Sequence, residues 1–195
     1  MAADKYRSFD ELRHREREGV DFSIHVISRE TPVAIIAPHG GMIEPGTSEI
    51  AAAIAGEDYG LYCFDGLRDR PHRDLHITSA NFREPKCIEL VAACDLVVAV
   101  HGLDGKERQF VEVGGLDTRL RDAICTSLHR ARFSAEVVTS GGLAGLSPAN
   151  ICNRGARMGG VQLEITRGLR DALRASPQGL ADFAGAVRLA IVAAL

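Results

Sequence analysis

The chain has 195 residues, of which 46% are hydrophobic and 25% charged, and its formal net charge is −3. This composition fits a globular protein with one sizeable core, and the negative balance offers no general attraction to nucleic acid. No apolar run reaches the roughly 18 residues that cross a membrane, and the first residues lack the apolar centre of a secretory signal. The five cysteines form no CxxC pair, which favours reduced thiols. We therefore expect a cytoplasmic protein without a nucleic-acid or membrane partner.

Apolar strands alternate with helices along the whole chain. In order, the pattern predicts a surface helix at 10–18, strands at 21–28 and 33–37, a helix capped by Thr47 or Ser48 and ending at Gly56, strands at 59–64 and 75–79, a helix at 84–94, strands at 96–102 and 109–115, a helix at 117–131, strands at 135–140 and 160–165, and two closing helices from about 166 and 179. Strands separated by helices favour one three-layer α/β/α domain with an open, mixed and mostly parallel sheet. We expect this domain to span 1–195, with 1–20 as a peripheral helical segment.

Polar side chains stand near the carboxyl ends of three predicted strands: His39, His101 and Glu164. Ligands of open α/β sheets gather outside these strand ends. A buried imidazole or carboxylate needs a partner, and a divalent cation would supply one. Together with Glu44, the two histidines form the two-histidine, one-carboxylate set of a catalytic zinc site, which leaves one position open for water. The sequence therefore predicts a zinc site at this edge of the sheet.

The chemistry of such a site gives Glu164 a role as well. Bound zinc lowers the pKa of water toward roughly 7 and polarises a carbonyl, so that a nearby carboxylate can act as general base. Gly40 and Gly41 allow a sharp turn that brings His39 and Glu44 to one ion. In the alternative interpretation, the histidines bond to loop backbone and Glu44 lies at a helix start, where a carboxylate is favourable.

A second group of polar residues lies in the stretch 147–160. Asn150, Asn153 and Arg154 are expected on one turn, and an arginine offers a planar fork that matches a carboxylate. We predict a clamp for a substrate anion here; the alternative is a loop held by its own amide hydrogen bonds. His76 alternates with two apolar neighbours and either lines the cleft or is a hydrogen-bonded strand histidine.

Six stretches carry a resemblance: "APHGGMIEPGTSEIA", "LHITS", "VAVHG", "VGGLD", "LAGLSPANICNRG" and "GGVQLEITRGLR". In this order they resemble the poly-γ-glutamate hydrolase family of phages and bacteria, a group of zinc peptidases with a carboxypeptidase-like α/β core. The resemblance runs from about residue 21 to about residue 172. It implies zinc as cofactor, metal ligation by His39, Glu44 and His101, and Glu164 in the general-base position.

We therefore predict a zinc-dependent hydrolase of γ-glutamyl amide bonds, which acts on a γ-glutamyl polymer or a small amide substrate. Glu164 would activate the attacking water and pass its proton to the leaving amine. Two alternatives are a zinc-dependent deacylase of small N-acyl amino acids and a non-catalytic metal- or ligand-binding protein of the same fold. A base beside the ion argues against a pure binding protein. The oligomeric state is left open by the sequence.

Overall fold

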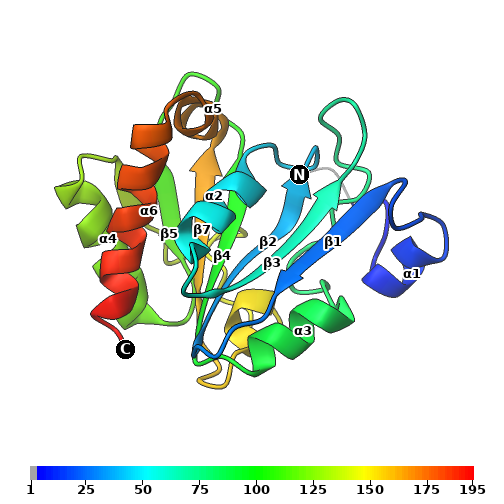
Figure 1. Ribbon diagram of the computed structural model, residues 1–195, viewed down its shortest axis with the longest axis horizontal. Coiled ribbons are helices and arrows are strands. Elements are labelled where there is room, and N and C mark those ends of the chain that lie inside the picture. The colour runs from blue at the N-terminus through cyan, green and yellow to red at the C-terminus, as the bar shows by residue number, and fades with distance from the viewer. Residues whose placement is uncertain (1–3) are drawn as a thin grey trace.

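The computed structural model describes residues 4–195, so the first three residues of the predicted 1–195 domain lie outside the described part. Within that part the strands form one seven-stranded sheet of order β1-β3-β2-β4-β7-β5-β6 (Figure 1). The strands are β1 (Phe22–Ile27), β2 (Val33–Gly41), β3 (Gly60–Gly66), β4 (Leu96–Leu103), β5 (Val111–Gly114), β6 (Ala135–Val137) and β7 (Val161–Thr166). The pairs β1·β3 and β5·β7 are antiparallel and the other pairs are parallel. The predicted single α/β domain with a mixed, mostly parallel sheet is confirmed.

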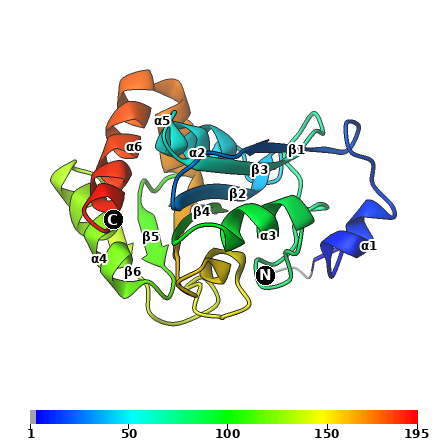
Figure 2. The same ribbon diagram turned by 60° about the horizontal axis from the view of Figure 1, so that its bottom comes forward.

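Helices cover both faces of this sheet and complete the three layers (Figure 2). They are α1 (Phe9–Arg13), α2 (Thr47–Ala55), α3 (Pro85–Ala92), α4 (Thr118–Arg130), the short 3-10 helix η1 (Ile151–Arg154), α5 (Arg167–Ala175) and α6 (Pro177–Val192). Val33 and Ile35 point into a first core, which holds α2, α4, α5 and α6. Ala34 and Ile36 point into a second core, which holds α1, α3 and η1. The central strands are apolar on both faces because both faces are buried.

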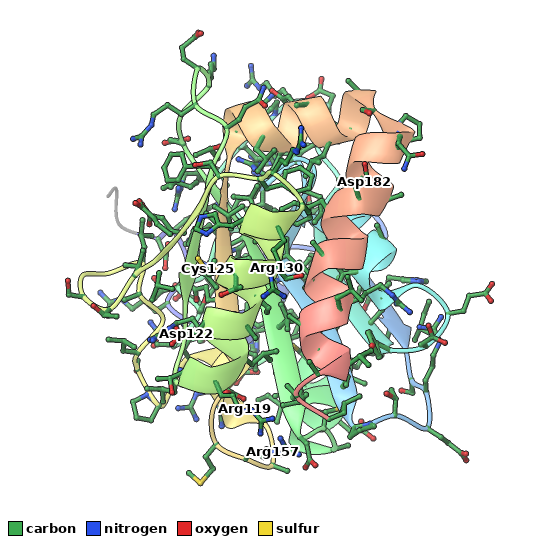
Figure 3. All side chains as sticks on the ribbon, turned by 90° about the vertical axis from the view of Figure 1, so that its left-hand side faces the viewer. Arg119, Asp122, Cys125, Arg130, Arg157 and Asp182 are labelled. Carbon is green, nitrogen blue, oxygen red and sulfur yellow. The ribbon has the colours of Figure 1, made fainter. Side chains whose placement is uncertain are left out.

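The helices α4 and α6 lie side by side on the outside of the first core (Figure 3). Their inner faces bury residues such as Leu120 and Phe183. A groove between them is lined by residues that include Asp122, Arg130 and Asp182, and it contains none of the predicted site residues. None of the helices in residues 4–195 combines the length and hydropathy that a membrane span needs.

The sheet has a topological switch point between β2 and β4. The strand β3 lies on one side of β2 and β4 lies on the other. The connecting helices α2 and α3 pack on opposite faces. A crevice forms outside the strand ends at such a point. On the far side of β4, the parallel register pairs His101 with Glu164 of β7, so both side chains project from the same face of the sheet.

The predicted strand at 75–79 is wrong, because these residues form a loop. Leu75 and Ile77 are fully buried in the second core. The N–H of Thr78 donates to the carboxylate of Asp4 at 2.7 Å instead of to a neighbouring strand. The alternation of buried and less buried residues therefore arises from the packing of a loop. It has the same two-residue period as a half-buried strand.

The predicted side-chain cap of α2 is also wrong. The helix follows Gly46, whose φ of 99° makes the left-handed turn, and no side chain caps its N-terminus. The hydroxyl of Thr47 instead donates to the carbonyls of His39 and Glu44, at 3.3 and 2.9 Å. Thr47 thus ties the turn that carries two predicted metal ligands.

Two elements end at least three residues before their predicted ends. Ser8 caps the N-terminal helix, which ends at Arg13 instead of residue 18. The edge strand β6 ends at Val137 instead of residue 140. Pro85 lies in the first turn of α3, as predicted, and all five cysteines are buried free thiols.

Candidate metal centre

His39 reaches the site because β2 is irregular near its carboxyl end. Between Ala37 and Gly40, β2 contains one residue more than the matching stretch of β3. A bulge of this kind redirects a side chain. Ala37 packs into the first core, whereas the ring of His39 lies edge-on to Phe82 of the second core, with ring centroids 6.3 Å apart. The bulge therefore turns His39 to the face that also carries His101.

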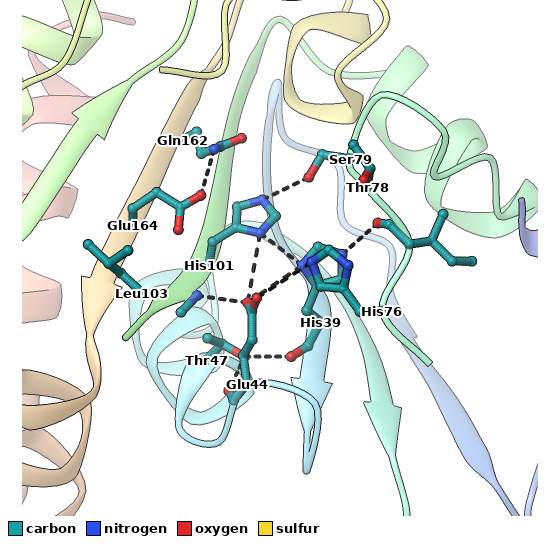
Figure 4. A network of polar contacts seen from close by, with 12 residues as sticks. His39, Glu44, Thr47, His76, Thr78, Ser79, His101, Leu103, Gln162 and Glu164 are labelled. Atoms are coloured by element: carbon teal, nitrogen blue, oxygen red, sulfur yellow. Dashed lines mark hydrogen bonds and ion pairs between the residues drawn. The ribbon is translucent and has the colours of Figure 1, made fainter. Parts of the chain in front are cut away.

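The side chains of His39, Glu44 and His101 converge outside β2 and β4 (Figure 4). The Nδ1 atoms of the two histidines are 3.1 Å apart, and Glu44 Oε2 lies 3.5 Å from Nδ1 of His39 and 3.9 Å from Nδ1 of His101. All three side chains are buried, and their ligand atoms lie within 4.8 Å of one another. Two imidazole nitrogens and a carboxylate oxygen that face one point are a donor set typical of zinc. The residues therefore fit a zinc ion.

The outer ring nitrogens of both histidines face oxygen atoms of one loop. Nε2 of His39 lies 2.8 Å from the carbonyl oxygen of Ile77, and Nε2 of His101 lies 3.4 Å from the hydroxyl of Ser79. Asp4 holds this loop through two hydrogen bonds from Thr78. A partner on the far nitrogen fixes the ring and the tautomer of a metal-binding histidine. The arrangement leaves the two Nδ1 atoms free to bind an ion.

The Glu44 carboxylate is held ionised at the centre of the cluster. The N–H of Gly102 donates to Oε2 at 2.7 Å. Burial opposes ionisation, but the electrostatic effect of the His39 ring and its hydrogen bond, the effect of the His101 ring and the bond from Gly102 outweigh it and lower the pKa of Glu44 to about 2. Burial, followed by the electrostatic effect of the neighbouring His39 ring, lowers the pKa of His101 to about 3. A neutral imidazole and an ionised carboxylate are the forms that bind a metal.

The buried Arg170 joins the segments that carry these side chains. Its guanidinium donates to the carbonyls of Pro45, Leu103 and Ile165. Those residues follow Glu44, His101 and Glu164 by one or two positions in the sequence. Because its nitrogens are used in this way, Arg170 fixes the spacing of the three segments.

Gly102→Ala is expected to weaken the cluster. A Cβ atom at this position would lie 2.7 Å from Cζ of Arg170 and 2.9 Å from Cβ of Glu44. Overpacking of this kind costs about 1–3 kcal/mol of stability. Displacing a partner of a metal ligand should weaken zinc binding about tenfold to hundredfold. Thermal unfolding and zinc titration measure both effects.

The matched control is Gly185→Ala on α6, where a Cβ meets no atom within 4 Å, and zinc affinity should not change. An unchanged affinity in Gly102→Ala would contradict this role of the backbone.

Glu164 lies one strand away from the cluster. It faces the same side of the sheet as His101, and its Oε1 accepts a hydrogen bond from Nε2 of Gln162 at 2.7 Å. Burial raises the pKa of Glu164 well above its usual range, and the negative charge of Glu44 adds to this effect. A carboxyl group with a raised pKa beside a candidate metal site is suited to proton transfer.

His76 lies directly beside the cluster. Its ring stacks on His39 with centroids 4.1 Å apart, and its Nε2 lies 3.9 Å from Oε1 of Glu44. Its Nδ1 lies 2.6 Å from the carboxylate of Asp4. Burial, followed by the electrostatic effect of the neighbouring His39 ring, lowers the pKa of His76 to about 4. The position agrees with a lining role, and a contact with substrate stays a prediction.

The amides of the 147–160 stretch are engaged inside the protein. Asn153 bonds through its side chain to the backbone of four residues: Leu116, Gly145, Ser147 and Gly160. Asn150 bonds to the N–H of Cys152 and to Gln162. Nη1 of Arg154 is buried and has no partner among residues 4–195. The amide bonds are those of the alternative interpretation, and a substrate contact by these three residues stays a prediction.

Three contacts of the site were not predicted from the sequence, namely those of Gln162, Ser79 and Arg170. Gln162 lies two residues before Glu164 in the same strand, and such residues share a face, so a signal was present. Ser79 and Arg170 gave no comparable signal, because their contacts depend on how a loop and a helix pack against the strand ends.

Comparisons with known proteins support the resemblance. The family model of poly-gamma-glutamate hydrolase matches residues 6–178. The chain is 39% identical over 167 residues to the SPbeta prophage-derived UPF0714 protein YoqZ of Bacillus subtilis, and the match covers 85% of this chain. The same match spans 60% of the length of YoqZ, so this relative is considerably longer.

Two solved structures are closely similar. A bacteriophage poly-gamma-glutamate hydrolase superposes with a TM-score of 0.92 at 32% identity, over 97% of both chains. The zinc-free apo form of YndL superposes with a TM-score of 0.90 at 30% identity, over 97% of this chain and 98% of that one. Both similarities therefore extend over nearly the whole chain.

Proposed function

Because the chain belongs to the poly-gamma-glutamate hydrolase family, we propose that it is a zinc-dependent hydrolase of γ-glutamyl amide bonds. The resemblance seen in the sequence is thereby confirmed at the level of the family, and a hydrolase is the enzyme class that the family implies. The observation that carries the proposal is the convergence of His39 Nδ1, His101 Nδ1 and Glu44 Oε2 within 4.8 Å of one another.

His39, Glu44 and His101 would hold the zinc ion. When bound, zinc polarises a carbonyl and lowers the pKa of a water molecule. Glu164 then accepts the proton of the attacking water and returns it to the nitrogen of the leaving amine. Burial and the negative charge of Glu44 raise the pKa of Glu164, which favours the protonated form that delivers the proton to the leaving amine.

A γ-glutamyl polymer carries one free α-carboxylate per residue, so positive charge near the cluster of His39, Glu44 and His101 favours its binding. The loop between β3 and α3 carries the exposed Arg70 and Arg73. Arg73 is close enough to His76 to lower the pKa of its imidazole. Exposed arginines of this kind attract a polyanion over about a Debye length, roughly 8 Å at physiological salt. We propose that this loop guides the polymer toward the cluster.

The test is an assay of the purified protein on poly-γ-glutamate, with and without zinc. We expect shortening of the polymer in the presence of zinc, loss of activity after chelation, and no cleavage of α-linked polyglutamate. Cleavage of small N-acyl amino acids alone would support the deacylase alternative. Stoichiometric zinc without turnover of either substrate would support a binding protein and contradict the proposal.

A further inference from the structure

A chain of buried amide groups leads from Glu164 to the backbone of the neighbouring loop. Oε1 of Glu164 accepts from Nε2 of Gln162 at 2.7 Å, and Oε1 of Gln162 accepts from Nδ2 of Asn150 at 2.8 Å. Nε2 of Gln162 also donates to the carbonyl of Leu143 at 3.2 Å, and Oδ1 of Asn150 accepts from the N–H of Cys152 at 3.2 Å. The exposed fractions of Asn150, Gln162 and Glu164 are 6%, 4% and 6%, so water does not compete for these groups.

The N–H of Cys152 and the carbonyl of Leu143 set the direction of the hydrogen bonds between Asn150, Gln162 and Glu164. The N–H of Cys152 can only donate, so Asn150 turns its oxygen to Cys152 and its NH2 group to Gln162. The carbonyl of Leu143 can only accept, so Gln162 turns its NH2 group to Leu143 and to Glu164. Turning either amide round would set donor against donor or acceptor against acceptor at a buried site, which is strongly disfavoured.

Packing also holds the Gln162 side chain in place. A Cβ atom added to Gly145 would lie 3.2 Å from Cβ and 3.3 Å from Oε1 of Gln162, so the backbone of Gly145 lies directly against the amide. Gly145 has a φ of 65°, which favours glycine at this close approach. The side-chain amide of Asn153 donates to the carbonyl of Gly145 and fixes this backbone.

We propose that Gln162, oriented by Asn150, is a positioning residue for the Glu164 carboxylate. The proposal rests on the proposed function, in which Glu164 transfers the proton. Gln162 binds one oxygen of the carboxylate, and the second oxygen points away from Gln162 (Figure 4). The terminal torsion of a glutamate is otherwise broad, and small errors in the placement of a reacting group reduce its rate strongly.

Asn150→Asp tests this role without changing either Gln162 or Glu164. The new carboxylate can still accept from the N–H of Cys152, but it cannot donate to Gln162. Oε1 of Gln162 then either faces an oxygen of the new carboxylate, or the amide turns round and its oxygen faces Glu164. We expect kcat on poly-γ-glutamate to fall about tenfold to hundredfold, with KM within about twofold and the zinc content unchanged. A rise in KM with an unchanged kcat would instead make Asn150 a substrate contact and overturn the proposal.

A double-mutant cycle separates positioning from damage to the loop. In a Glu164→Gln background, residue 164 carries an amide that accepts or donates equally well, so Asn150→Asp should change the residual kcat by less than about twofold. The matched control is Ser147→Ala, because the Ser147 hydroxyl accepts from the N–H of Ala149 in the same loop and is separate from the amide chain that leads to Glu164. Any effect of Ser147→Ala should persist in the Glu164→Gln background. An equally persistent effect of Asn150→Asp would contradict the proposal.

A measurement that needs no activity completes the test. If Asn150→Asp does not fold, Gln162→Met keeps the side-chain size, removes the donor and should give the same loss of kcat. In the metal-free protein, the side-chain amide signals of Gln162 in a nitrogen–proton correlation spectrum should shift on Asn150→Asp and on Glu164→Gln. Unchanged signals would overturn the positioning role, whereas an inactive parent protein with shifted signals would contradict only the proposed function.

Discussion

His101→Ala is expected to remove most of the bound zinc and nearly all of the activity. The parent protein should carry about one zinc per chain, as a site with three protein ligands does. Nδ1 of His101 lies 3.1 Å from Nδ1 of His39 inside a fully buried cluster, and alanine supplies no replacement donor. Zinc contributes several kcal/mol to reactions of this class, and about 1.4 kcal/mol corresponds to a factor of ten in rate. We therefore expect kcat to fall roughly a thousandfold or more.

Metal analysis and the polymer assay on one preparation measure both effects. The matched control is His25→Ala, which removes an exposed histidine of β1 that has no place in the cluster. It should retain the parent zinc content and the parent kcat. A His101→Ala protein that holds a full complement of zinc would show that His101 is not a ligand.

The strands that carry the site could be predicted from the sequence because both of their faces are buried. The apolar runs at 33–37 and 96–102 correspond to the start of β2 and nearly all of β4. A strand that is covered on both sides reads as a continuous apolar run, which few other elements imitate. The loop at 75–79 has the alternation of a strand without a strand partner, so a local pattern was insufficient there.

The metal ligands could be predicted in part, because two of them follow strands that are recognisable from their apolar runs. His39 and His101 follow apolar runs, and the carboxyl ends of parallel strands meet at one edge of a sheet. Their meeting depends on β2 and β4 being neighbours, which is decided by pairing between distant segments. The bulge that turns His39 toward His101 leaves no mark in the apolar pattern of β2. The apolar pattern alone does not show that His39 and His101 lie together, whereas the family resemblance implies that both bind one metal ion.

The orientation of the site residues could not be predicted from local sequence. The partners of the histidine rings come from a loop, and Asp4 holds that loop from another part of the chain. The amides of Asn150 and Gln162 lie 12 residues apart and meet only when the loop packs on β7. Contacts of this kind arise from tertiary packing, and they determine which atoms of the side chains face the cluster of His39, Glu44 and His101.

Glu164→Gln is expected to abolish most turnover while leaving the zinc site and the fold in place. The substitution keeps the volume of the side chain, and the oxygen of the new amide can still accept from Gln162. It removes the group that accepts a proton. General-base catalysis contributes about a hundredfold to ten-thousandfold, so kcat should fall by that factor. The zinc content should not change, because the proposed ligands are three other residues.

A purely structural Glu164 would behave in the opposite way. Its substitution would lower the melting temperature and leave turnover per folded molecule intact. An ionised structural Glu164 would need a cation as partner, and Arg167, three residues along the chain, pairs with Asp171 instead. The matched control is Glu112→Gln, because Glu112 has the same side chain and lies opposite Glu164 on the adjacent strand. We expect this control to change kcat by only a few-fold, since general-base catalysis needs a group within reach of the transferred proton. Melting temperature, zinc content and kcat measured on the same preparations decide between the two roles, and a Glu164→Gln protein that cleaves γ-glutamyl amides at the parent rate would contradict the mechanism.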